Sequence, residues 1–318
     1  MTQLLLSVVR KTEEARDIYS FELASPDGAD LPPFEAGAHI DVHVAPGLVR
    51  QYSLCNHPAE RHRYVIAVLC DAASRGGSKT LHSELHVGDL VTVGEPRNHF
   101  ALVPASRTLL VAGGIGVTPL LSMAEWLHHT DASFTLHYCA RDPERAAFHR
   151  CLQRMPYADR VQFHFDGGDV AQRLDLPALL AEPDPELHLY VCGPAGFIEY
   201  VVDSARDHGW PSANIHLEYF SNQDLDTSND GAFEIQIAST GVRLAVAADE
   251  SASTVLNRSG FSIPISCEQG VCGTCLTGVL EGIPEHRDLC LSDDERAAND
   301  QFTPCCSRAK GKLLVLDL

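Results

Sequence analysis

The chain has 318 residues, of which 45% are hydrophobic and 21% charged, and its formal net charge is −19 at pH 7. At roughly 100–200 residues per domain, this length predicts two or three domains. The acidic charge argues against nucleic-acid binding, which requires clustered Lys and Arg. The sequence holds no run of about 18 apolar residues, so we expect no membrane span. The short apolar segment that starts the chain indicates a β-strand rather than a signal peptide.

Eleven cysteines are present, an odd number in a long chain, which disfavours a disulfide framework. Several lie inside apolar runs, among them Cys70 and Cys139. Scattered cysteines in apolar strands are typical of buried thiols in a reducing cytosol. We therefore expect a cytoplasmic protein.

Residues 1–102 have the pattern of a small antiparallel β-barrel domain. The segment 63–69 is a clear strand, and the turn at Gly88 and Asp89 precedes a second strand over 90–93. A short helix is predicted near 78–86.

Residues 103–224 change to alternating strands and helices, which predicts a parallel sheet. The run 108–112 is continuously apolar, as in a strand buried on both faces. The other predicted elements are a helix over 119–128, strands over 133–140, 161–165 and 188–192, and a helix after Pro194.

A polar, turn-rich segment, 222–231, separates this block from the last one, and we assign the linker to 225–231. Residues 232–318 form an α+β domain with predicted strands over 233–238 and 243–246 and a short helix near 253–259.

The last block contains Cys267, Cys272 and Cys275 in a C-x4-C-x2-C pattern. With a distant fourth cysteine, this is the plant-type [2Fe–2S] spacing. The fourth ligand is Cys305 or Cys306, with Cys290 available in principle. Unrelated core cysteines and a zinc site are the alternatives, although zinc sites favour paired C-x2-C units or histidines.

The segments 266–275 and 300–309 resemble the C-terminal ferredoxin domain of the phthalate dioxygenase reductase family, which includes reductase components of vanillate demethylase. The resemblance covers the whole chain in the order flavin domain, NAD domain, plant-type (β-grasp) ferredoxin domain. It implies that Cys305 is the fourth ligand and Cys306 its neighbour. It also implies a monomer that reduces a Rieske-type oxygenase component acting on aromatic acids.

A candidate flavin segment lies in the first block. Its residues are Arg50, Gln51, Tyr52, Ser53 and Leu54. An arginine can hold a phosphate bidentately, a tyrosine ring can pack on a flavin, and a serine hydroxyl can bond near flavin N5. By itself the segment is a weak signal, and an ordinary strand is the alternative.

A second flavin segment opens the predicted helix near 78–86 with Gly76, Gly77 and Ser78, whose backbone N–H groups suit a phosphate. The family resemblance implies that these two segments bind FMN rather than FAD. It also implies that Phe220 lies near the flavin, although a core aromatic residue is the plainer interpretation.

A glycine loop between a strand and a helix is the first NAD candidate. Gly113, Gly114 and Gly116 would allow close approach of a pyrophosphate, Thr118 is expected to cap the helix, and Pro119 suits its first position. The loop is not the G-x-G-x-x-G fingerprint, and a generic strand–turn–helix is the alternative.

A second NAD element consists of Cys192, Gly193 and Pro194 at the end of another buried strand. In flavin reductases of this type such a turn lies beside the nicotinamide, and Cys192 is interpreted as a positioning residue because hydride transfer needs no nucleophile. Asp142 could bond the ribose hydroxyls and select NADH, although Arg141 argues the other way.

These motifs together predict an NADH-dependent electron-transfer reductase without a general acid–base pair. A flavin can accept a hydride and release electrons singly to a [2Fe–2S] cluster. Two alternatives stay open from the sequence: a stand-alone NADH oxidase or ferric or quinone reductase, and a non-enzymatic iron–sulfur redox sensor.

Overall fold

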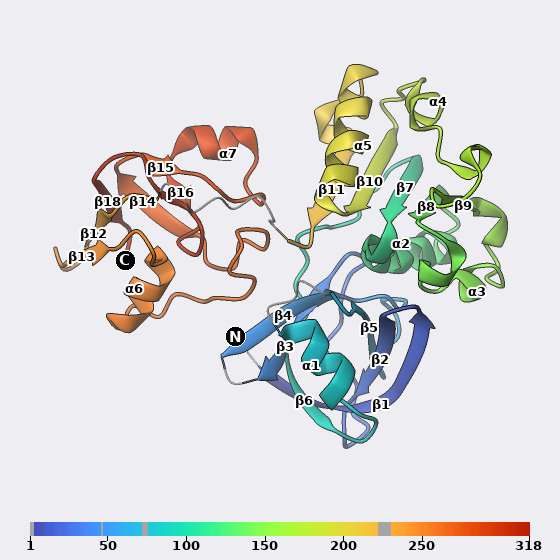
Figure 1. The fold of residues 1–318 in the computed structure, drawn as a ribbon, viewed down its shortest axis with the longest axis horizontal. Helices are drawn as coiled ribbons and strands as arrows, with labels where there is room; N and C mark the ends of the chain where they lie inside the picture. The colour runs from blue at the N-terminus through green and yellow to red at the C-terminus, as the bar shows by residue number, and fades with distance from the viewer. Residues whose placement is uncertain (1–2, 46, 72–75, 222–229) are drawn as a thin grey trace. The chain divides into compact units, whose positions relative to one another are not determined.

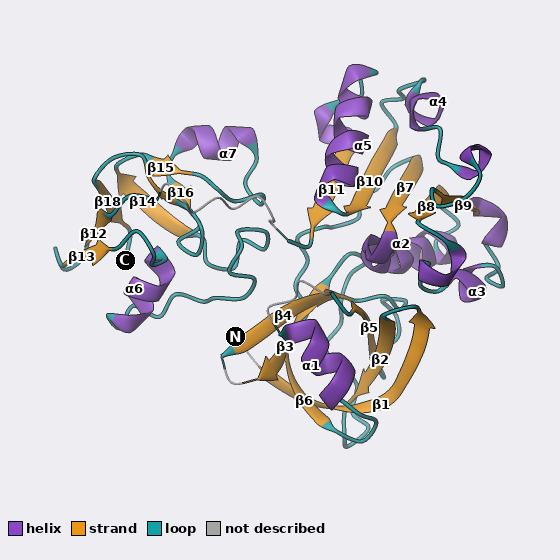
Figure 2. Ribbon diagram, viewed as in Figure 1, coloured by secondary structure: helices purple, strands orange, loops and turns teal. Residues whose placement is uncertain are grey.

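The computed structural model describes residues 3–45, 47–71, 76–221 and 230–318. The chain divides into two compact units, residues 1–218 and 219–318. The first unit contains an antiparallel sheet and a parallel sheet, and the second contains a smaller mixed sheet (Figure 2). Most of the predicted linker lies outside the described residues.

The first sheet has six strands in the order β4-β3-β6-β1-β2-β5 (Figure 1). Their bounds are β1 (Gln3–Ala15), β2 (Ile18–Ala24), β3 (His39–Ala45), β4 (Leu48–Ser53), β5 (Tyr64–Leu69) and β6 (Leu90–Gly94). A bridge between Leu54 and Ile66 joins the two edges, so the sheet closes into the expected barrel. Alternate residues point into a barrel core that includes Phe21, Ile40 and Tyr64. Helix α1 (Gly77–Glu84) packs against β3, β4 and β5.

The parallel sheet has the strand order β11-β10-β7-β8-β9. Its strands are β7 (Arg107–Gly113), β8 (Ser133–Ala140), β9 (Val161–Phe165), β10 (Leu187–Gly193) and β11 (Ile215–Tyr219). Six of the seven residues of β7 are buried, as the continuous apolar run predicted. Every predicted strand of this block is present.

Helices and short turns of helix connect these strands. They are α2 (Val117–His129), α3 (His149–Leu152), α4 (Leu176–Leu180) and α5 (Ala195–Asp207). Helix α2 packs on β7, β8 and β10, while α5 packs on β10 and α4. Side chains from α2, including Leu120 and Met123, fill one core together with Leu110 and Tyr138 of the sheet.

The second unit is built on a five-stranded sheet in the order β13-β12-β18-β14-β16. The elements are β12 (Phe233–Ile237), β13 (Arg243–Val246), α6 (Ala252–Arg258), β14 (Thr277–Glu281), β15 (Pro284–Glu285), α7 (Asp293–Ala298), β16 (Gln301–Phe302), β17 (Arg308–Ala309) and β18 (Leu313–Leu316). The first and last strands, β12 and β18, pair in parallel, while β13 and β14 run antiparallel to their neighbours. This is the α+β arrangement expected for the last block.

Candidate functional site

The side chain of Arg50, on β4 of the barrel, packs against the N-terminus of α1. A Cβ atom on Gly77 would lie 2.7 Å from Cγ of Arg50, so only glycine lets the arginine pack against the first turn of the helix. Gly76 precedes that turn with a φ of 102°, a conformation that glycine adopts without strain. The Ser78 hydroxyl accepts a hydrogen bond from the backbone N–H of Asp71 at 3.2 Å. The two predicted flavin segments therefore meet, with a guanidinium beside backbone N–H groups, an arrangement that suits a phosphate.

The other residues of β4 have different surroundings. The Gln51 amide donates to Asp41 at 3.2 Å and contacts His39 at 3.1 Å, and Asp41 pairs with Arg97 at 2.6 Å. Gln51 therefore takes part in a polar network of the barrel. Leu54 is fully buried and forms the bridge that closes the barrel, which is a structural role. Burial raises the pKa of the Tyr52 phenol, so the ring is neutral.

The glycine loop and the Cys-Gly-Pro turn meet at adjacent strand ends. Strands β7 and β10 pair in parallel with Ala112 opposite Cys192. A Cβ on Gly116 would overlap the carbonyl of Cys192, and one on Gly113 would lie 2.7 Å from the Phe197 ring. Pro194 is the residue before the first turn of α5. Both elements lie at the carboxyl edge of the sheet, where open α/β folds bind their ligands.

Two predicted helix positions are wrong. The residue before α2 is Gly116, and Thr118 and Pro119 are the second and third residues of the helix rather than its cap and first residue. The chain enters the helix through a short turn over residues 114–116, so Thr118 already has a helical backbone. Its hydroxyl donates to the carbonyl of Ile115 at 3.0 Å instead of accepting from the helix.

Asp142 caps a short turn after β8, where its carboxylate accepts from the backbone N–H of Arg145 at 3.0 Å and lies 3.6 Å from the Arg145 guanidinium. A cavity of about 240 Å³ lies nearby and is lined by Gly114, Ile115 and the guanidinium-bearing residues Arg16, Arg141 and Arg145. Three arginines beside a glycine loop suit a pyrophosphate. The sequence analysis did not find Arg16 and Arg145, because neither lies in a glycine motif.

Glu218, at the end of β11, is a site residue that the sequence analysis also missed. Its carboxyl is hydrogen-bonded to Ser53, and its negative charge adds to the effect of burial in raising the pKa of the Cys192 thiol. The residue is half-buried, but its Oε2 atom is inaccessible and has no hydrogen-bond partner. Burial raises the pKa of the carboxyl to about 8, against the opposing effect of the Ser53 hydroxyl. One buried carboxyl thus bonds to the end of β4 and acts electrostatically on the turn at the end of β10. In the sequence, Glu218 is marked by its position two residues before Phe220, a predicted site residue.

Phe220 is 39% exposed and belongs to the second unit.

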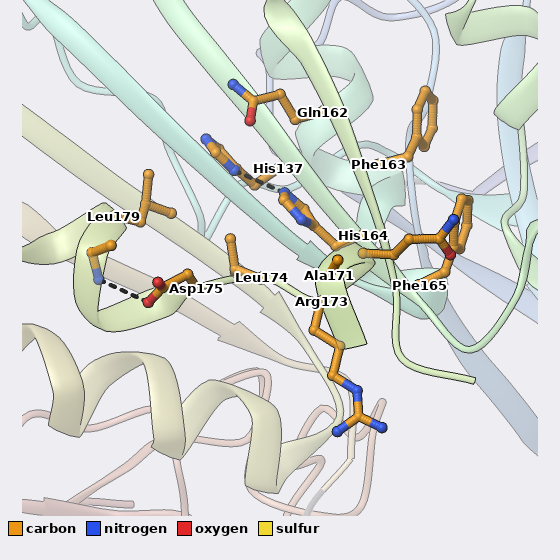
Figure 3. Close-up of a pocket in the computed structure, with 12 residues that line it drawn as sticks. His137, Gln162, Phe163, His164, Phe165, Ala171, Arg173, Leu174, Asp175 and Leu179 are labelled. Carbon is orange, nitrogen blue, oxygen red and sulfur yellow. Dashed lines mark hydrogen bonds between the residues drawn. The ribbon is translucent and has the colours of Figure 1, made fainter. Parts of the chain in front are cut away.

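A second, larger cavity of the first unit, of about 750 Å³, lies beside β8 and β9 (Figure 3). His137 and His164 contact each other there at 3.1 Å, and burial lowers the pKa of His137 to about 4. Among the described residues that line this cavity, none is a predicted site residue.

Four cysteine thiols converge in the second unit. The sulfur of Cys267 contacts those of Cys272 and Cys305, and Cys305 also contacts Cys275. These hydrogen bonds from Cys272 and Cys305 lower the pKa of Cys267. Cys306 instead contacts the Thr303 hydroxyl at 3.2 Å, besides its neighbour Cys305.

The loop that carries the first three thiols directs backbone N–H groups toward sulfur. Gln269 donates to Cys267 and Thr274 donates to Cys272, each at 3.4 Å. Gly270 and Gly273 have φ values of 74° and 64°, which lets the chain turn tightly. Four thiols with inward N–H donors are the donor set that a [2Fe–2S] cluster takes.

Residues 235–310 match the family model of the 2Fe-2S iron-sulfur cluster binding domain. Over 319 residues the chain is 52% identical to vanillate O-demethylase oxidoreductase of Pseudomonas sp. (strain HR199 / DSM 7063), covering 100% of both chains. It is 42% identical to phthalate dioxygenase reductase of Burkholderia cepacia, covering 99% of this chain and 97% of the relative. A solved phthalate dioxygenase reductase superposes with a TM-score of 0.78 at 42% identity, covering 99% of this chain and 98% of that one.

Fold, thiol cluster and these similarities define an electron-transfer reductase with a [2Fe–2S] domain. The chain belongs to the family of the vanillate O-demethylase oxidoreductases and phthalate dioxygenase reductases. The expected oxidoreductase, its fold class and its [2Fe–2S] domain are confirmed. The stand-alone reductase and the redox sensor are not favoured, because the relatives are components of oxygenase systems. No helix among the described residues is long and apolar enough to cross a membrane.

Proposed function

We propose that the chain takes a hydride from NADH at the junction of β7 and β10 and delivers single electrons from its cluster to a Rieske-type aromatic oxygenase or demethylase. One observation carries this proposal. Glu218 is hydrogen-bonded to Ser53 of β4, and its charge adds to the effect of burial in raising the pKa of Cys192, so the segment that we assign to the flavin and the turn that we assign to the nicotinamide both lie near one buried carboxyl. Hydride transfer requires the nicotinamide ring and the flavin ring to lie in contact.

When bound, FMN accepts a hydride and releases electrons singly to the [2Fe–2S] cluster. In this proposal Arg50 and the backbone at Gly76, Gly77 and Ser78 hold the flavin phosphate. Tyr52 would pack against the flavin, and the Ser53 hydroxyl would hydrogen-bond near its N5 atom. The family resemblance implies that Phe220 lies near the flavin. These roles fit the contact of Arg50 with Gly77 and the bond of Ser53 to Glu218.

For the nucleotide, Gly113, Gly114 and Gly116 allow the pyrophosphate to approach the backbone, and Arg16 and Arg145 neutralise its charge. Asp142 bonds the ribose, and the turn of Cys192, Gly193 and Pro194 positions the nicotinamide. Burial raises the pKa of Cys192, which keeps the thiol neutral and suits a positioning role.

Cys267, Cys272, Cys275 and Cys305 are the proposed cluster ligands. The contacts of Cys305 with Cys267 and Cys275 support the choice of Cys305 over Cys306. We further propose three domains, 1–102, 103–224 and 232–318, with 225–231 as the linker, in a monomeric cytoplasmic protein.

The test is an anaerobic titration of the purified protein with NADH, followed by visible absorbance and EPR together. Flavin bleaching with the signal of a reduced [2Fe–2S] cluster is the expected result. Flavin bleaching without that EPR signal would contradict electron transfer from the flavin to the cluster. An absence of bleaching would contradict NADH as the electron donor. Subsequent oxidation by the oxygenase component of a vanillate O-demethylase, faster than by oxygen, would identify the class of acceptor.

A further inference from the structure

Asp288 connects the two cysteine-bearing segments of the second unit. It is 2% exposed, and its carboxylate accepts from the backbone N–H of Leu291 at 3.0 Å and from the Ser307 hydroxyl at 3.4 Å. A Cβ on Gly270 would lie 2.8 Å from Cα of Asp288, and Leu289 donates to the Gly270 carbonyl at 2.9 Å. Asp288 is thus packed against the loop that carries Cys267 to Cys275 and bonded to the segment that carries Cys305.

The charge of Asp288 is incompletely compensated. Nε of Arg296 lies 3.8 Å from its Oδ2 atom, and Nη2 of Arg296 donates to its backbone carbonyl. Nδ1 of His286 lies 3.5 Å from Oδ1. Within the described part of the chain, Arg296 Nε and both ring nitrogens of the buried His286 have no hydrogen-bond partner. Burying a carboxylate is unfavourable, and an ion pair as long as that of Asp288 with Arg296 offsets little of the unfavourable free energy. The carboxylate of Asp288 is therefore held mainly by hydrogen bonds from Leu291 and Ser307 rather than by a close ion pair.

We propose that Asp288 is a positioning residue that holds the two ligand segments in register and lowers the reduction potential of the cluster. The proposal rests on the ligand set given above. Reduction adds one electron to the cluster without making or breaking a bond, so a nearby negative charge disfavours the reduced form. Arg296 acts in the opposite sense, because its positive charge partly cancels that of Asp288. If Asp288 and Arg296 served packing alone, removing their charges would not shift the reduction potential of the cluster in opposite directions.

The first test is Asp288→Asn in the full-length holoprotein, which keeps the shape and removes the charge. We expect the ratio of reduced to oxidised cluster at a fixed potential to rise about tenfold, measured by EPR during a redox titration. Asp294→Asn, an equal charge change on the exposed helix α7, is the matched control and should leave the ratio within about twofold. Iron and sulfide content is measured for each variant.

The second test is Arg296→Gln, for which we expect the ratio to fall. Shifts of the two variants in the same direction, or an unchanged ratio in a fully loaded Asp288→Asn protein, would overturn the proposal. If Asp288→Asn folds but loses iron, the positioning role is supported, and the sign of the Arg296→Gln shift decides the electrostatic role. An error in the ligand set is separately visible, because Cys305→Ser would then retain its cluster.

Discussion

Cys305 and Cys306 are adjacent in the chain but have different neighbours. Cys305 contacts two other thiols of the cluster loop, whereas Cys306 contacts the Thr303 hydroxyl and packs against Gly270. We expect Cys305→Ser to lose the cluster, because a serine oxygen is a poor replacement for a thiolate. We expect Cys306→Ser to keep it, since serine preserves a hydroxyl contact with Thr303. Iron and sulfide content and visible absorbance measure both, and the reverse pattern would assign the ligand to Cys306.

Glu218 gives a prediction in pH. The folded-state pKa of about 8 lies above the ordinary value of 4.5. Between these values the unfolded chain loses its proton while the folded chain keeps it, so this group makes folding less favourable as pH rises from about 4.5 to 8. Glutamine cannot ionise. We therefore expect the melting temperature of Glu218→Gln to exceed that of the parent by an amount that grows over this range and then levels off.

The matched control is Glu199→Gln, the same substitution on the exposed face of α5. A constant difference for Glu218→Gln would show that the carboxyl ionises normally in the folded protein. Both variants are compared by thermal unfolding of the holoprotein from pH 4.5 to 9.

At the scale of elements, the junction of β7, α2 and β10 requires glycine for close packing. Because a side chain at Gly116 would overlap the Cys192 carbonyl, Gly116→Ala must displace backbone atoms. We expect it to lower the free energy of unfolding by about 1–3 kcal/mol and to raise the KM for NADH. Denaturant titration and steady-state kinetics measure the two effects.

Gly196, in the first turn of α5, is the control for that substitution. A Cβ there meets no atom within 4 Å, so Gly196→Ala should be neutral or stabilise by up to about 1 kcal/mol. Equal losses for Gly116→Ala and Gly196→Ala would contradict the close approach of α2 to β10.

The N-terminus of α1 and the side chain of Arg50 form one anion site in our proposal. Arg50→Ala removes a charge-assisted hydrogen bond and should weaken FMN binding about 10- to 100-fold. Arg10→Ala, whose side chain is 69% exposed and pairs loosely with Glu22, is the control with an equal change of charge. Flavin fluorescence during dilution of the holoprotein measures the affinity, and equal affinities would remove Arg50 from the site.

Most elements were predictable because each has a strong local signal. The strands β8, β9 and β13 have the predicted bounds, since a periodic apolar pattern bounded by polar residues marks both ends. Helix α7 was not predicted, although Ser292 and Glu295 form a capping box. A helix of six residues with no buried side chain has no apolar stripe to reveal it.

At the scale of the whole molecule, the net charge of −19 predicts electrostatic docking to a basic surface on the oxygenase. Electron delivery to the oxygenase component of a vanillate O-demethylase should slow several-fold between about 0.05 M and 0.5 M salt, because the charges are then screened. Reduction of the chain's own cluster by NADH is the internal control and should change little. A rate independent of ionic strength would exclude charge-driven docking.

The sequence by itself determined the class of fold, the order of its parts and the three cofactor motifs, because each depends on residues close together in the chain. The cysteine spacing, the glycine loop and the strand periodicity are signals of this local kind. Only the tertiary structure brought Gly116 against Cys192, closed the barrel at Leu54, and bonded Glu218 to Ser53. It also distinguished Cys305 from Cys306 by their contacts. Contacts between residues far apart in the chain follow from packing, which no local pattern specifies.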